Sequence, residues 1–258
     1  MRILVTNDDG INAPGLKVLA DIARSLTDDV WIVAPDTNQS GASHSLTLHE
    51  PLRCMEVADR SFAVRGTPTD CVIMGVRHIL LNAPPDLILS GVNRGSNLAE
   101  DVTYSGTVAG AIEGSLLGIR SLALSQSIDY EAGEIHWDTP LVHAPGIVRR
   151  ILETDWNPSI LMNINFPAVR PNDVKGVMVT VQGKRDQSLL HIDERFDTWK
   201  QPYYWFNFER RRSNPIEGSD LWAVYQGLIS VTPLTPNLTH LPATDALSGV
   251  FNSRGSAT

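Results

Sequence analysis

The stretch MRILVTNDDGINAPGL, residues 1–16, decides the fold of this chain. Residues 2–6 are a short β-branched apolar run, typical of a buried strand, and Asp8, Asp9 and Gly10 follow it closely. In α/β folds, ligands bind where parallel strands end. Two adjacent carboxylates repel each other at such an edge unless a cation lies between them, and carboxylate oxygens bind hard divalent ions. Asn-Asp-Asp-Gly is also good turn chemistry, so a solvated turn is the alternative.

Strand and helix patterns alternate outward from this stretch. Apolar side chains at helical spacing predict a first helix over 16–26, and Thr67-Pro68-Thr69-Asp70 begins another one with a capping-box pattern. The predicted strands are 2–6, 30–34, 87–89, 121–125 and 160–166, with a strand or hairpin excursion at 47–57 and 61–64; the further helices are 67–81, 105–117 and 139–152. This alternation predicts an α/β fold with a doubly wound, mostly parallel sheet.

The pattern changes after about residue 167. Strands are predicted over 176–181 and 221–231, and the polar and aromatic stretch between them is too long for a simple connection. We therefore predict one domain over residues 1–247 that includes an arm or lid at 184–220, followed by a flexible tail at 248–258. The aromatic cluster from Trp199 to Phe208 fits either stacking on a base or a contact with a partner subunit, and the second alternative would make the protein a homodimer or homotetramer.

Composition excludes several classes of protein. The chain has 258 residues, 42% hydrophobic and 19% charged, which permits a sizeable core, and its net charge of −8 argues against binding to duplex nucleic acid. Cys54 and Cys71 form no C-x-x-C pair, which argues against a zinc or thioredoxin-like site. The absence of a signal-peptide pattern and of a long apolar segment predicts a cytoplasmic protein without a membrane span.

Oxygen-bearing side chains follow three predicted strands. Asp8 and Asp9 follow the first strand. Ser40 follows the second strand, and Asn93 follows the third. If these strands are neighbours in a parallel sheet, the three loops open on one edge of it. Their oxygens would then supply part of the coordination shell of a Mg²⁺ or Mn²⁺ ion. Each loop alone is weak evidence, because Asn, Ser and Gly also occur in loops for backbone reasons.

The helix start at Tyr104-Ser105-Gly106-Thr107 adds a candidate phosphate site. Free N–H groups and the helix dipole favour an anion there, and Gly106 would let the anion approach the backbone. Ordinary capping by Ser105 or Thr107 is the alternative. A divalent metal beside a phosphate pocket predicts phosphoryl transfer or hydrolysis of a phosphate ester.

Motifs along nearly the whole chain resemble one family. They are NDDGINAPG at 7–15, VAPDTNQSGASHSLTL at 33–48, GTPTDCV at 66–72, SGVNRGSN at 90–97, YSGTVAGAIEG at 104–114, NINFP at 163–167 and SVTPL at 230–234. In these motifs the chain is similar to the stationary-phase survival protein E (SurE) family of metal-dependent 5′(3′)-nucleotidases. The chain departs from the family pattern at Ala99, where many members carry glycine.

The resemblance implies a fold, a reaction and a site. The family fold is Rossmann-like, with three αβα layers and a C-terminal arm that exchanges between subunits. Members hydrolyse nucleoside 5′- and 3′-monophosphates with one divalent metal ion per subunit, Mg or Mn, and some act on short polyphosphate. The implied residues are Asp8, Asp9, Ser40 and Asn93 as metal ligands, Asn97, Ser105, Gly106 and Thr107 on the phosphate side, and Asp8, Asp9 and Asn97 in catalysis.

Other functions fit the motifs less well. A phosphatase with an aspartate nucleophile needs D-x-D, whereas Asp8 and Asp9 are adjacent, so a metal-activated water is favoured as the nucleophile. A receiver-like signalling domain also binds Mg²⁺ through an acidic pair, but it needs an aspartate where this chain has Asn93, and it is much shorter. No G-x-G-x-x-G follows the first strand and no G-x-x-x-x-G-K-[ST] occurs, which excludes a dinucleotide-binding oxidoreductase and a P-loop enzyme.

Overall fold

A nine-stranded, mostly parallel sheet organises the fold in our computed structural model, which describes residues 1–129, 132–185, 188–210 and 214–251. The strand order is β3-β4-β2-β1-β5-β6-β7-β11-β8, and within this sheet the described antiparallel pairs are β3/β4 and β7/β11. The strands are β1 (Ile3–Thr6), β2 (Val30–Pro35), β3 (Arg53–Ala58), β4 (Ser61–Arg65), β5 (Leu87–Arg94), β6 (Arg120–Gln126), β7 (Leu161–Phe166), β8 (Val177–Val179) and β11 (Ile229–Leu234). The predicted α/β class is confirmed.

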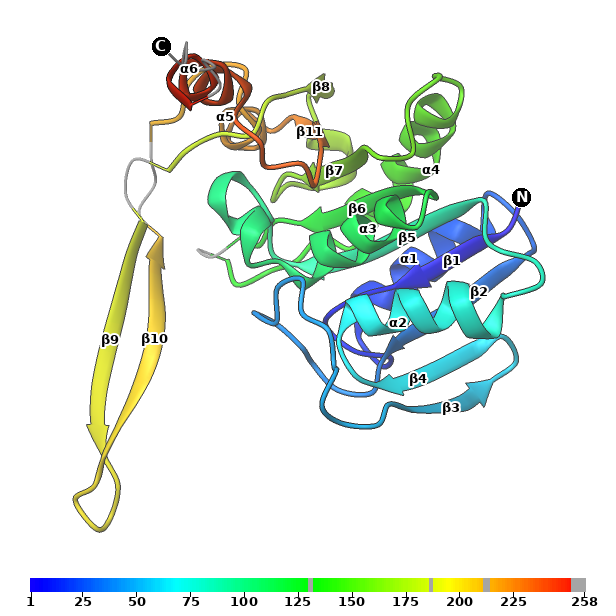
Figure 1. The fold of residues 1–258 in the computed structure, drawn as a ribbon, viewed down its shortest axis with the longest axis horizontal. Helices are drawn as coiled ribbons and strands as arrows, with labels where there is room; N and C mark the ends of the chain where they lie inside the picture. Colours follow the sequence, from blue (N-terminus) through cyan, green and yellow to red (C-terminus); the bar gives the residue numbers. More distant parts are fainter. Residues whose placement is uncertain (130–131, 186–187, 211–213, 252–258) are drawn as a thin grey trace, which may run out of the picture.

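Helices cover both faces of this sheet (Figure 1). One face carries α1 (Pro14–Arg24) and α4 (Asp138–Leu152), and the other carries α2 (Pro68–Met74) and α3 (Gly106–Leu116). The first layer buries one apolar cluster around Ile3, Val5 and Leu19, and the second buries another around Leu4 and Val72. The fold therefore has the three αβα layers expected of a doubly wound sheet.

Two glycines let α3 lie close to the sheet. A Cβ on Gly110 would lie 2.8 Å from the Ser90 Oγ of β5, and one on Gly114 would lie 2.1 Å from the Ser121 Oγ of β6. Larger residues would push the helix outward. The close packing brings the N-terminal end of α3 to the edge where β1 and β5 end.

Three sequence predictions about these elements were wrong at their ends. The strand predicted over 87–89 continues to Arg94, because β5 keeps pairing with β6 beyond an irregularity between Ser90 and Asn93. The helix predicted to residue 81 is α2 followed by a π-helical turn, Gly75–Ile79, and residues 47–52 of the predicted excursion are not in a strand.

The strand predicted over 221–231 is half helix. Residues 220–225 form α5 (Asp220–Tyr225), because the Ser219 side chain accepts a hydrogen bond from the backbone N–H of Trp222 and so caps a helix start. Only the second half of the prediction is a strand, β11, which pairs antiparallel with β7 and parallel with β8.

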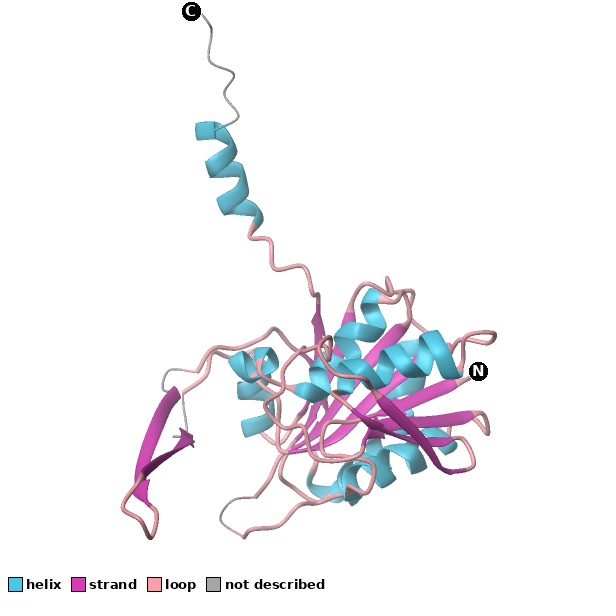
Figure 2. Ribbon diagram, turned by 60° about the horizontal axis from the view of Figure 1, so that its bottom comes forward, coloured by secondary structure: helices cyan, strands magenta, loops and turns pink. Residues whose placement is uncertain are grey.

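The predicted arm contains a separate antiparallel hairpin. Strands β9 (Ser188–Phe196) and β10 (Pro202–Arg210) pair with each other and lie apart from the main sheet (Figures 1 and 2). The aromatic side chains from Phe196 to Phe206 are exposed, among them Trp199 at 80%.

The expected flexible tail begins inside a helix. Figure 2 shows α6 (Leu241–Phe251) standing away from the body, with none of its residues buried. Residues 248–251 of the predicted flexible tail lie in this helix, and residues 252–258 lie outside the described part. No helix in the described ranges combines the length and apolar character needed to cross a membrane.

Candidate active site

One cavity of about 370 Å³ opens where β1 and β5 end, beside the start of α3. Five of the predicted site residues line it: Asp8, Ser40, Asn93, Asn97 and Ser105. The other three, Asp9, Gly106 and Thr107, lie just outside the lining and contact residues that belong to it. The structure thus brings all eight predicted positions to one place, although they come from four separate segments.

Asp8 is the buried acid of this cavity, with 4% of its surface exposed. The Thr107 hydroxyl donates a hydrogen bond to Asp8 Oδ1. The pKa of Asp8 is raised to about 6, chiefly by burial; the hydrogen bond from Thr107 opposes this rise, and the negative charge of Asp9 contributes to it. The ionised carboxylate is therefore costly in the absence of a cation, as expected of a metal ligand.

Asp9 is held by backbone and amide donors. The Arg94 backbone N–H lies 3.1 Å from Asp9 Oδ2, and Asn38 Nδ2 lies 3.5 Å from Oδ1. Burial raises the pKa of Asp9 as well, and Arg94 offsets part of the rise through this hydrogen bond and its charge. Both members of the acidic pair are therefore set beside β5 and the loop that follows β2.

The loop that carries Ser40 is tied directly to the acidic pair. The backbone N–H of Gln39 donates to Asp8 O at 2.7 Å, and that of Ser40 donates to Asn38 Oδ1 at 2.8 Å. On β5, Asn93 Nδ2 donates to Gly95 O at 2.9 Å, so the side-chain oxygen of Asn93 is the atom that could bind a cation.

The donor set fits a hard divalent ion. Two carboxylates, a hydroxyl and an amide oxygen are the ligand types that Mg²⁺ and Mn²⁺ accept. No group of three or more His, Cys, Asp or Glu side chains suited to a metal occurs among the described residues. A metal here would therefore rest on two carboxylates supplemented by neutral oxygens and water.

The first residues of α3 and its cap have structural roles in addition to the expected phosphate site. Ser105 caps the helix by accepting from the backbone N–H of Val108 at 3.1 Å, and Thr107 supports Asp8. A Cβ on Gly106 would lie 2.7 Å from Asp8 Cβ and 3.0 Å from its Oδ2. The packing of Asp8 therefore requires glycine at this position, and the expected approach of an anion to Gly106 stays a prediction.

Asn97 is fixed by residues that sequence reasoning missed. Its backbone N–H donates to Asn165 Oδ1 at 2.8 Å, and its carbonyl accepts from Asn163 Nδ2 at 2.8 Å and from Asn165 Nδ2 at 3.1 Å. Its side-chain Nδ2 donates to Ser125 Oγ at 2.8 Å. All three partners are fully buried on β6 and β7. Asn163 and Asn165 interrupt an otherwise apolar strand, and this is the feature of the sequence that could have indicated a buried polar contact.

The loop after Asn97 is anchored by the C-terminal part of the chain. Ala99, the departure from the family pattern, has φ of +52°, a conformation that favours glycine, and its N–H donates to Asp220 Oδ2 at 2.9 Å. The other Asp220 oxygen accepts from the Gly183 N–H at 2.8 Å. Arg185 forms an ion pair with Asp101, a cavity-lining residue, at 2.6 Å. One wall of the cavity is therefore held by Gly183, Arg185 and Asp220.

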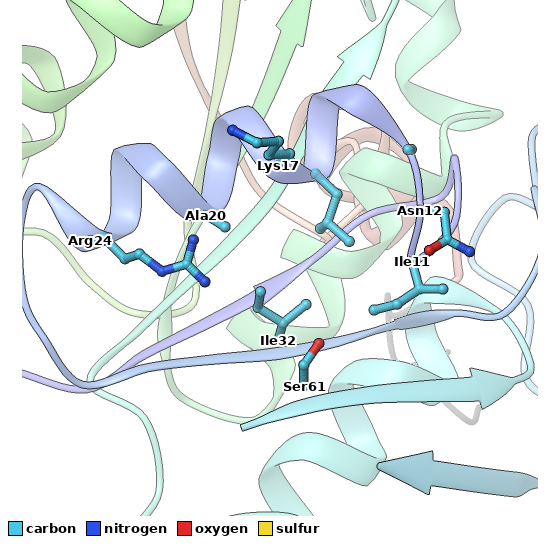
Figure 3. Close-up of a pocket in the computed structure, with 9 residues that line it drawn as sticks. Ile11, Asn12, Lys17, Ala20, Arg24, Ile32 and Ser61 are labelled. Atoms are coloured by element: carbon cyan, nitrogen blue, oxygen red, sulfur yellow. The ribbon is translucent and has the colours of Figure 1, made fainter. Parts of the chain in front are cut away.

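A second hollow of about 290 Å³ lies beside α1 (Figure 3). Lys17 and Arg24 of α1 line one side, and Ile32 and Ser61 from neighbouring strands lie opposite. Both cations already form ion pairs with Asp21, at 2.9 and 3.3 Å, and no lining residue carries a carboxylate. This hollow lacks the donor set of the first cavity.

Fold and site together define an α/β enzyme with an acidic site at the carboxyl edge of a doubly wound sheet. Residues 3–189 match the family model described as Survival protein SurE. The chain belongs to the SurE family. The predicted family and the prediction of an enzyme are thereby confirmed.

Named relatives agree over nearly their whole length. The 5′-nucleotidase SurE of Caulobacter vibrioides (strain NA1000 / CB15N) is 57% identical over 253 residues, 97% of this chain and 96% of that protein. The 5′-nucleotidase SurE of Methylobacterium sp. (strain 4-46) is 59% identical over 245 residues, 94% and 96% of the two chains. The crystal structure of the SurE protein from Aquifex aeolicus is 39% identical, with a TM-score of 0.84 and coverage of 97% and 99%.

Proposed function

We propose that the protein is a 5′-nucleotidase, a metal-dependent phosphomonoesterase that hydrolyses nucleoside 5′-monophosphates, and also 3′-monophosphates, to nucleoside and phosphate. The observation that carries the proposal is the single cavity in which Asp8, Ser40 and Asn93 meet Asn97 and the start of α3. Relatives 57% and 59% identical bear the name 5′-nucleotidase. Short polyphosphate is a further candidate substrate.

Asp8, Asp9, Ser40 and Asn93 would hold one Mg²⁺ or Mn²⁺ ion through their side-chain oxygens. When bound, such an ion lowers the pKa of a water molecule and stabilises negative charge on phosphate oxygens. The protein's own contribution is to fix the ligands. Thr107 orients Asp8, and the Arg94 backbone orients Asp9.

The substrate phosphate would lie between Asn97 and the start of α3. Gly106 is the first helical residue, so its N–H has no partner within the helix and can donate to a phosphate oxygen. One hydrogen of Asn97 Nδ2 is used by Ser125, and the second can donate to the same phosphate. These donors orient the ester and stabilise charge that develops on its oxygens.

Phosphate release from a panel of nucleoside 5′- and 3′-monophosphates tests the proposal. Each substrate is assayed with Mg²⁺, with Mn²⁺ and with chelator. We expect turnover with at least one metal, none in chelator, and none for an Asp9→Asn variant that remains folded. Release at the same rate in chelator would contradict the metal-dependent reaction, and no release with either metal would contradict the function itself.

We also propose that the chain assembles as a homodimer or homotetramer through residues 184–220. The hairpin exposes Ile192, Phe196 and Trp199, and the separate helix α6 exposes Phe251 at 77%. Exposed apolar surface of this extent usually marks a contact between proteins. Residues 1–247 would then be one domain whose arm reaches a partner subunit.

A further inference from the structure

Arg94 is a cation at the mouth of the cavity that the proposed mechanism has used only through its backbone. It is the last residue of β5, its side chain is exposed, and it lines the cavity next to Asn93. Among the described residues that line this cavity, Arg94 alone is a lysine or arginine. Its guanidinium is therefore the one positively charged group of the lining.

No ion pair engages this guanidinium in the part of the chain that the structure describes. The acidic neighbours already have partners: Asp9 accepts the Arg94 backbone N–H at 3.1 Å, and Asp101 pairs with Arg185 at 2.6 Å. Other arginines behave differently, since Arg2 and Arg60 both pair with Asp29. Arg94 thus retains its five donors for a ligand.

Charge balance explains why the site needs such a cation. Asp8 and Asp9 would be neutralised by one divalent ion, so the dianionic phosphate of a substrate would still lack a counter-charge, and Asp101 adds a further negative group to the lining. A guanidinium matches two phosphate oxygens with two parallel hydrogen bonds. We propose that the Arg94 side chain binds the non-bridging oxygens of the substrate's phosphate group, an inference that rests on the proposed function.

The proposal predicts effects of opposite sign on phosphate and on metal. Arg94→Gln should weaken inhibition by inorganic phosphate and raise KM for a nucleoside monophosphate, each by about ten-fold, since hydrogen bonds to charged groups are lost. The same change removes a positive charge near Asp9, so Mn²⁺ binding measured by calorimetry without phosphate should stay equal or become tighter. Arg94→Lys keeps the charge but loses the two parallel hydrogen bonds, so its phosphate inhibition and its KM should lie between those of the wild type and of Arg94→Gln.

Arg77→Gln is the matched control, because Arg77 is also exposed but does not line the cavity, and it should leave all three measurements unchanged. Unchanged phosphate inhibition and KM in Arg94→Gln would overturn the proposal. So would an equal loss of Mn²⁺ and phosphate binding, since that would assign Arg94 to the support of Asp9. Calorimetric titration with inorganic phosphate and Mn²⁺ tests Arg94 even if the wild type releases no phosphate from nucleotides, which separates this proposal from the proposed function.

Discussion

Asp8→Asn should stabilise the metal-free protein while it abolishes turnover. The pKa of Asp8 is about 6 in the folded chain, against an ordinary value of 3.8, because the carboxyl is buried. The folded state therefore holds this proton more tightly than the unfolded chain does. The stability that this provides is complete below pH 4 and is lost as the pH rises through about 6.

A pKa difference of about 2 corresponds to about 3 kcal/mol of lost stability at neutral pH. Asparagine is neutral at every pH and can still accept a hydrogen bond from the Thr107 hydroxyl, so the variant avoids the cost of burying a charge. For a domain of this size, 3 kcal/mol corresponds to roughly 6–12 °C in Tm. The gain should appear at pH 8 and nearly vanish at pH 4, where the wild-type carboxyl is largely protonated.

Thermal unfolding in chelator at pH 4 and pH 8 measures this difference. Asp28→Asn is the control, because Asp28 is an exposed carboxylate outside the cavity, and it should change Tm little at either pH. Added Mg²⁺ or Mn²⁺ should raise the Tm of the wild type but not that of Asp8→Asn. A Tm of Asp8→Asn at or below wild type at pH 8, or an equal gain at both pH values, would refute the reasoning.

Three further predictions follow from the same site and from the arm. Ser40→Ala and Asn93→Ala each remove one neutral oxygen, so each should raise the metal concentration for half-maximal rate roughly ten-fold; no shift in either variant would mean that these side chains do not meet at the metal. Gly106→Ala places a Cβ 2.7 Å from that of Asp8, so calorimetry should show weaker Mn²⁺ binding. Unchanged Mn²⁺ binding with slower turnover would mean that glycine is needed for the approach of the phosphate and not for the packing of Asp8. Deletion of residues 199–208 should give smaller particles in light scattering than the wild type, and a wild-type mass near 28.3 kDa would exclude assembly through the arm.

The sequence predicted the central sheet because its strands are short apolar runs between clear helix patterns. It also predicted that Asp8, Ser40 and Asn93 would share an edge, since adjacent parallel strands place their ends together. It failed at residues 221–225, where the apolar run with Leu221, Trp222 and Val224 lies in a helix that Ser219 caps. Local propensity was overruled there by a polar cap and by tertiary packing.

The residues that hold the site residues in place could not be predicted from the sequence, for a different reason. Asn165 lies 68 residues from Asn97, and nothing near Asn97 in the sequence indicates that contact. The steric limit at Gly106 was likewise not visible in the sequence, because it comes from Asp8, which precedes Gly106 by almost a hundred positions in the chain. Ligand types follow from local chemistry, whereas the groups that hold them depend on how distant segments pack.

The anchoring of the cavity wall by Gly183, Arg185 and Asp220 limits how early the site can form during synthesis. Ala99 and its partner Asp220 are 121 residues apart in the chain. At about 5–20 residues per second, a ribosome needs roughly 6–24 s to add that length. We therefore expect a nascent chain to carry Asp8 and Asp9 for many seconds before Asp220 is available to hold the loop at Ala99. A chain released early, between β7 and the hairpin, would contain all eight predicted site residues and still be inactive.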